Sequence, residues 1–93
     1  MTVELQDMRW AVVASQHRSL RQAAETLNLR QSTLSRRLRD LKHRLGAVLF
    51  ERMNGGTRPT IAGHEFLDTA RRIVDESDTA FARLKTGAVT SKY

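Results

Sequence analysis

The segment from residue 20 to residue 39, LRQAAETLNLRQSTLSRRLR, constrains the fold more than any other part of this 93-residue chain. Its apolar residues recur at helical spacing on both sides of Asn28, a residue type that tolerates the positive φ of a tight turn. Ala24 is small at the point where two short helices would cross closely. The leucines that would fill the angle between those helices are Leu20, Leu27, Leu29, Leu34 and Leu38. This pattern predicts a helix-turn-helix.

The helix predicted after the turn, from about Gln31 to Leu45, has two different faces. At about 100° per residue, one narrow stripe that must face the core contains Leu34, Leu38, Leu41 and Leu45. The opposite face carries Ser32, Arg36, Arg39 and His43, with Ser35 and Thr33 on its flanks. Short hydroxyl donors near a helix start, with long cations beside and after them, suit a helix that enters the major groove of DNA.

The net charge of +6 is unevenly distributed along the chain. Residues 1–60 contain eleven Lys or Arg against five Asp or Glu, whereas residues 61–93 contain five of each. The excess is densest from Arg30 to Arg44, where six basic residues accompany one acid, Asp40. Charge alone leaves a solvated face and a polyanion-binding face equally open. A merely solubilising face would mix Glu with Lys, so the composition of this helix favours DNA binding.

The remaining segments predict a mainly α-helical fold, a winged helix-turn-helix of three helices and a β-hairpin wing. Residues 5–16 have helical periodicity, and Ser19 with Gln22 forms a capping-box pattern that begins the short second helix. The turn residues 54–56, Asn-Gly-Gly, follow a run of β-formers, which predicts the hairpin.

A long final helix is predicted from Ile61 to about Leu84, with Thr60 as its cap. Its heptad seam consists of Gly63, Leu67, Ala70, Val74, Ser77, Phe81 and Leu84, and beside the seam lie Phe66, Ile73 and Ala80, which would pack against the body. The alternative is that the seam covers the chain's own core, but a helix of about 36 Å is too long for that, so we expect a dimerisation helix. The expected domains are 1–59 (winged helix-turn-helix), 60–85 (linker and dimerisation helix) and 86–93 (flexible tail).

Three segments, SLRQAAETLNL, QSTLSRRLRDLKHRLGAVLFER and RPTIAG, together resemble the N-terminal DNA-binding segment of LysR-type transcriptional regulators. The resemblance spans residues 5–85 and implies a winged helix-turn-helix followed by a linker helix through which two chains dimerise. It also implies DNA contacts from the recognition helix at Gln31, Ser32, Thr33, Ser35 and Arg36, and from the wing at Arg52 and Arg58. Arg30 stands where the family usually has a small hydroxyl residue, which removes a helix cap and adds a phosphate contact.

The predicted DNA contacts extend these positions to both sides. On the recognition helix they are Arg30, Gln31, Ser32, Thr33, Ser35, Arg36 and Arg39, and on the wing and its flanks they are Arg52, Asn54, Arg58, Ser19 and Arg21. Members of the family normally carry a C-terminal effector-binding domain. This chain has no counterpart to it, so no small-molecule effector is expected.

Other kinds of site are not predicted. The histidines, His17, His43 and His64, include no i, i+4 pair, and the chain has no cysteine, so neither a metal site nor a disulfide is expected. No cofactor or catalytic pattern is present, which argues against an enzyme. No apolar run reaches membrane-spanning length and no signal peptide is recognisable, so we expect a cytoplasmic, nucleoid-associated protein.

Three functions remain for a chain with these features. The one favoured is sequence-specific binding to double-stranded DNA by a homodimer that regulates bacterial transcription. A second is a minimal interaction protein that heterodimerises with a full-length relative and antagonises it. A third is non-specific packaging of nucleic acid by charge, which the hydroxyl-rich start of the recognition helix disfavours.

Overall fold

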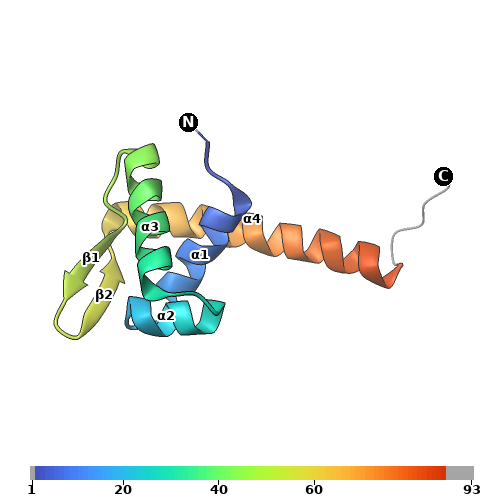
Figure 1. Ribbon diagram of the computed structural model, residues 1–93. Helices are drawn as coiled ribbons and strands as arrows, with labels where there is room; N and C mark the ends of the chain where they lie inside the picture. Colours follow the sequence, from blue (N-terminus) through green and yellow to red (C-terminus); the bar gives the residue numbers. More distant parts are fainter. Residues whose placement is uncertain (1, 88–93) are drawn as a thin grey trace.

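Three helices, a two-stranded hairpin and a long fourth helix make up the computed structural model, which describes residues 2–87 (Figure 1). The elements in chain order are α1 (Leu5–Ser15), α2 (Leu20–Leu27), α3 (Gln31–Leu45), β1 (Phe50–Met53), β2 (Gly56–Pro59) and α4 (Ile61–Thr86). This order confirms the predicted winged helix-turn-helix. Thr86 still belongs to α4, and the rest of the predicted tail after Gly87 lies outside the described residues. Within residues 2–87, no helix is both long and apolar enough to cross a membrane.

The turn between α2 and α3 forms as its residue types predict. Asn28 has a left-handed backbone with φ of +58°, and the N–H of Leu29 donates to the Ala24 carbonyl at 2.8 Å. At the start of α2, the Ser19 hydroxyl accepts a hydrogen bond from the N–H of Gln22 at 3.2 Å. These short-range bonds satisfy donors and acceptors that helix ends otherwise leave open, so the helix bounds follow closely from the sequence.

The core lies where α1 packs against α2, α3 and α4. Its largest fully buried side chains are Leu34, Leu41 and Leu67, and small buried residues, Ala11, Ala14, Ala23, Ala24 and Ala70, allow the helices to approach closely. Burying one leucine contributes about 1.5–3 kcal/mol. The predicted apolar stripe of α3 therefore faces the core, with Leu38 and Leu45 half-buried at its edges.

The hairpin wing is held against the loop between α1 and α2. The strands pair antiparallel, with Glu51 opposite Arg58. The N–H of Thr57 donates to the Arg18 carbonyl at 2.9 Å. A Cβ atom on Gly56 would overlap that same carbonyl oxygen, so the approach requires glycine. The wing therefore has a defined position next to α3.

The first half of α4 covers the domain's own core, so the dimer prediction is wrong for this part of the seam. Gly63, Leu67, Ala70 and Val74 are all buried within the chain. A Cβ on Gly63 would overlap the carbonyl oxygen of Leu49, because the chain before β1 passes directly over the helix. These four residues are unavailable to a second chain, since their neighbours in the same chain already cover them.

The second half of α4 extends past the body of the molecule (Figure 1). Phe81 is 55% exposed and Leu84 is 64% exposed. Phe66 packs against the core as expected, but Ile73 is 38% exposed and Ala80 is also exposed, contrary to the prediction that both pack against the body. Ala80 is exposed because the helix extends past the body there. Ile73 comes one residue before the buried Val74, about 100° away around the helix, so its side chain is directed away from the core.

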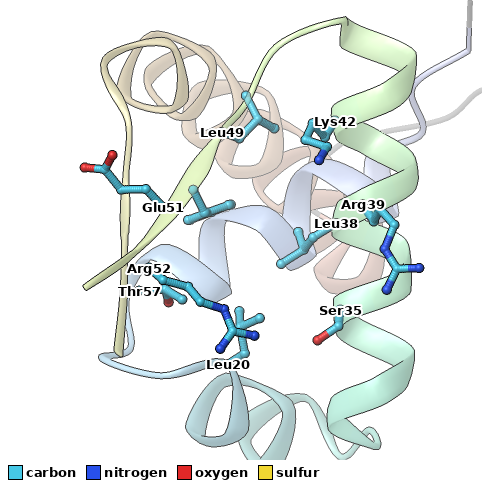
Figure 2. A pocket seen from close by; sticks show the side chains of 10 residues that line it. Leu20, Ser35, Leu38, Arg39, Lys42, Leu49, Glu51, Arg52 and Thr57 are labelled. Atoms are coloured by element: carbon cyan, nitrogen blue, oxygen red, sulfur yellow. The ribbon is translucent and has the colours of Figure 1, made fainter. Parts of the chain in front are cut away.

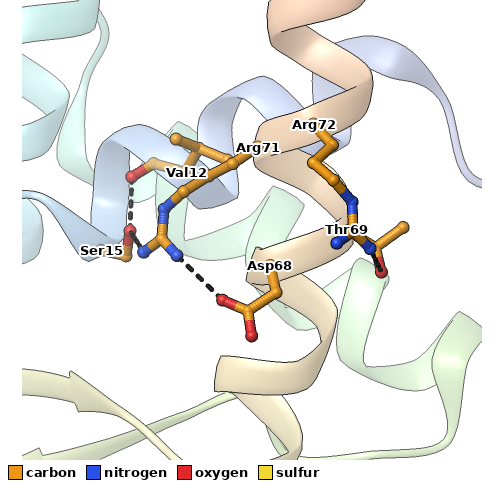
Figure 3. Close-up of polar contacts among 6 residues, drawn as sticks. All are labelled: Val12, Ser15, Asp68, Thr69, Arg71 and Arg72. Carbon is orange, nitrogen blue, oxygen red and sulfur yellow. Dashed lines mark hydrogen bonds and ion pairs between the residues drawn. The ribbon is translucent and has the colours of Figure 1, made fainter.

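Polar contacts join α4 to α1 near the place where α4 leaves the body of the molecule. Arg71 contacts the Asp68 carboxylate at 3.4 Å and the Ser15 hydroxyl at 3.5 Å (Figure 3). About two turns farther along α4, Asp78 accepts two hydrogen bonds from Arg9 of α1, at 2.7 and 3.0 Å. These hydrogen bonds hold the pKa of Asp78 below its usual 3.8 and raise the pKa of Arg9.

Candidate nucleic-acid interface

The face of α3 that points away from the core carries the side chains predicted to contact DNA. Arg30, Gln31, Ser32, Thr33, Arg36 and Arg39 are exposed, and Ser35 is half-buried. Arg30 precedes the helix without a side-chain capping bond, as its substitution for a hydroxyl residue predicts. Within residues 2–87, Arg30, Arg36 and Arg39 have no acidic partner at ion-pair distance. Their charges are therefore available to an external anion.

Two other cations of α3 face inward, onto a buried carboxylate. The Asp7 side chain is 2% exposed, and its two oxygens lie 3.5 Å from the Arg37 guanidinium and 3.2 Å from that of Arg44. Asp7 also accepts a hydrogen bond from the N–H of Glu4, and Arg37 stacks 5.0 Å from the centre of the Trp10 ring. The basic surface of α3 is thus smaller than its five Lys and Arg residues suggest, because two of them bind α1.

The wing presents one free arginine and one paired arginine. Arg52 on β1 is exposed and has no acidic partner among the described residues, and Asn54 is exposed at the hairpin turn. Arg58, in contrast, donates from Nε to Glu51 on the opposite strand at 2.8 Å. Its positive charge is therefore partly neutralised within the wing.

The predicted flanking residues lie together beside the start of α3. Ser19, Arg21, Gln31 and Arg52 line one hollow between the start of α2 and the wing. The Ser19 hydroxyl is already engaged as the cap of α2. Arg21 is exposed and lies 3.7 Å from Glu25 one turn along, a weak surface pair. Residues from three separate elements are thereby brought to one surface.

The amino-acid sequence matches a known family of proteins. A model of the family described as bacterial regulatory helix-turn-helix protein, lysR family, matches residues 5–64, from the start of α1 into α4. The chain belongs to the LysR family of bacterial regulatory helix-turn-helix proteins. The resemblance inferred from the sequence is confirmed.

Relatives and solved structures share this LysR-family domain. The uncharacterized HTH-type transcriptional regulator YdcI of Escherichia coli (strain K12) is 41% identical over 78 residues, covering 84% of this chain and 25% of YdcI. A CbnR DBD–DNA complex superposes with a TM-score of 0.82 at 30% identity, covering 94% of this chain and 100% of that one. A BenM DBD in complex with catB site 1 DNA gives 0.83 at 28% identity, covering 95% and 98%. The chain spans about a quarter of the length of the curated relatives it matches.

Sequence reasoning did not name two residues that lie beside the predicted contacts. Lys42, on α3, lines a groove against the wing together with Arg39 and Arg52 (Figure 2). Thr57, on β2, lines the same groove. Lys42 could have been predicted from the helix wheel, because it lies on nearly the same face of the helix as Ser35. No local signal points to Thr57, because its place depends on how the wing docks.

Proposed function

We propose that this chain binds double-stranded DNA in a sequence-specific manner, as a dimer, and regulates bacterial transcription. The observation that carries the proposal is the exposed face of α3, which combines Gln31, hydroxyl residues and unpaired arginines beside a positioned wing. The CbnR and BenM structures named above contain DNA, which supports the proposal. A duplex-binding regulator works where the chromosome lies, so we infer a cytoplasmic, nucleoid-associated location.

The division of work among the side chains follows from their chemistry. Arg36 and Gln31 have the donor geometry to recognise purine edges in the major groove, where each good bidentate contact is worth about 1–3 kcal/mol of discrimination. Arg30 at the start of α3 and Arg52 on the wing are placed to neutralise phosphates, which contribute affinity without sequence information. Arg58 contributes less than a free arginine would, because Glu51 competes for its charge.

The test is to select a preferred duplex from a random pool and to measure its affinity by fluorescence anisotropy against a scrambled duplex. Arg36→Ala should cost about 1–3 kcal/mol on the preferred duplex and relax base preference there. Arg72→Ala is the matched control, since it removes the same charge from an exposed position on α4. If a dimer neutralises six to ten phosphates, the wild-type slope of log K against log salt should be about −5 to −9.

Two results would contradict this proposal in different ways. Equal losses on preferred and scrambled duplexes for Arg36→Ala would remove the recognition role of α3. A nearly flat salt response of the wild type would remove DNA binding altogether.

We propose that the second half of α4 supplies the dimer contact. Ile73, Ser77, Ala80 and Leu84 follow one another at heptad spacing, and Phe81 flanks this stripe. The large members of the set are exposed although they are apolar, which is typical of a surface that is covered in the working assembly. In this proposal the stripe takes the place of the predicted seam residues that are buried within the chain, Gly63, Leu67, Ala70 and Val74. Sedimentation at tens of micromolar tests it, since a monomeric wild type would count against it.

A further inference from the structure

A groove runs between α3 and the first strand of the wing (Figure 2). One wall consists of Ser35, Arg39 and Lys42 from α3, and the other consists of residues 49–52 leading into and along β1. Leucines from both walls and from α2 make its lining largely apolar, and its volume is about 280 Å³. Apolar walls limit the access of water and strengthen electrostatic attraction inside.

Three cations line this groove without an acidic partner. Arg39, Lys42 and Arg52 are absent from the ion pairs found among residues 2–87. The acid on the groove wall, Glu51, is bound to Arg58 at 2.8 Å, and Figure 2 shows its carboxylate directed away from the other labelled side chains. The groove therefore carries a net positive charge that nothing in the described chain neutralises.

Neutral donors add to these charges. The Thr57 hydroxyl oxygen is buried and has no hydrogen-bond partner within the described residues. The hydroxyl of Ser35 points from α3 into the space toward the wing (Figure 2). Cations and a hydroxyl group along one groove are the donor types from which a phosphate oxygen accepts hydrogen bonds.

The position of the groove identifies the source of that anion. If α3 enters the major groove and the wing reaches the adjacent minor groove, the DNA strand that separates the two grooves must pass between α3 and β1. We propose that this groove binds one backbone phosphate of the duplex, with Arg39 and Lys42 contacting it from α3 and Arg52 from the wing. This inference rests on the proposed DNA binding, and it adds Lys42 as a phosphate ligand.

The experiment compares Lys42→Gln with Lys85→Gln, which removes the same charge from the exposed end of α4. Lys42→Gln should reduce the steepness of log K against log salt by about 0.9 per groove, hence about 1.8 for a dimer. The ratio of preferred to scrambled affinity should stay at the wild-type value, because a phosphate contact carries no base preference. Lys42→Arg should keep the wild-type slope, and circular dichroism checks that each variant is folded.

A second arm locates the phosphate on the DNA. Methylphosphonate is substituted at one phosphate at a time along the preferred duplex, which removes single negative charges. At one position in each half-site, the substitution should weaken wild-type binding but add nothing to the loss in Lys42→Gln.

The outcomes separate this inference from the function on which it rests. Suppose that the wild type binds DNA, that Lys42→Gln keeps the wild-type slope of log K against log salt, and that its loss of affinity is independent of every methylphosphonate substitution. The proposal that the groove binds a phosphate is then wrong, and the proposal of DNA binding stands. If, in addition, inorganic phosphate at constant ionic strength shifts the amide resonances of Lys42 and Thr57, the groove binds a free anion instead, which also overturns the inference. If the wild type binds no DNA, both proposals fail together.

Discussion

The two halves of α4 carry similar apolar spacing in opposite surroundings. From Gly63 to Val74 the apolar face packs on the body, and Leu67 is fully buried there. Beyond Ser77 the helix leaves the body, and Phe81 and Leu84 are mostly exposed. A heptad pattern therefore indicates that a helix face is apolar, but it does not say what covers that face. Any apolar neighbour removes the same area from water, whether it belongs to the same chain or to another.

The exposed half gives the largest expected effect. Phe81→Asp combined with Leu84→Asp should abolish dimerisation at tens of micromolar and leave the monomer folded. Each protomer loses two apolar contacts, so the dissociation constant should rise about a hundredfold or more. Sedimentation and circular dichroism measure the two results. The control is Thr79→Asp with Ala82→Asp, which adds the same charges on the opposite face of the helix. If the control raised the dissociation constant of the dimer as much as the Phe81 and Leu84 changes do, the added charge rather than the loss of this stripe would explain the effect.

Two leucine truncations compare the halves directly. Leu67→Ala should destabilise the monomer by about 2–5 kcal/mol, because it leaves a cavity in the core. Leu84→Ala should change monomer stability by no more than about 0.5 kcal/mol, since its side chain is 64% exposed. Urea unfolding at a concentration where both variants are monomeric provides the measurement. Similar losses in the two variants would contradict the division of α4 into a buried half and an exposed half.

The smallest expected effect concerns the boundary between the halves, where Arg9 binds Asp78. The lowered pKa of Asp78 means that its ionised form is stabilised in the folded state. This contribution is present above the usual pKa of 3.8 and is lost as the pH falls through the lowered value. Asp78→Asn should therefore be slightly less stable than the wild type at neutral pH, and the difference should vanish in acid. A difference that persists below the lowered pKa would mean that the ion pair is not its cause. Both side chains are partly exposed, so added salt should also reduce it.

A similar division exists on α3, where identical residue types serve different partners. Arg36 is exposed on the side away from the core, whereas Arg37, its neighbour in the chain, lies against Asp7 and Trp10. The helix wheel separates these two arginines from the sequence alone. It does not predict that Asp7 and Arg44, 37 positions apart, come within 3.2 Å.

Signals that act within one helical turn determined most of the secondary structure. Ser19 and Thr60 accept N–H donors three residues ahead, and Asn28 takes the left-handed conformation between α2 and α3. Each of these requires only neighbours in the chain, so residue type and spacing suffice to predict it. The motifs of the LysR family were recognisable for the same reason, since they lie in continuous segments.

Tertiary structure alone decided which surfaces remain free. The carbonyl of Arg18 positions the wing through Thr57, Glu51 neutralises Arg58, and the loop at Leu49 covers Gly63. Two of these three contacts join residues that are not neighbours in any helix or strand, and their formation depends on how whole elements dock. Spacing predicts which side of an element is apolar or charged. Whether that side meets the core, another side chain or an external partner depends on packing, because burial and charge pairing are properties of two surfaces rather than of one segment.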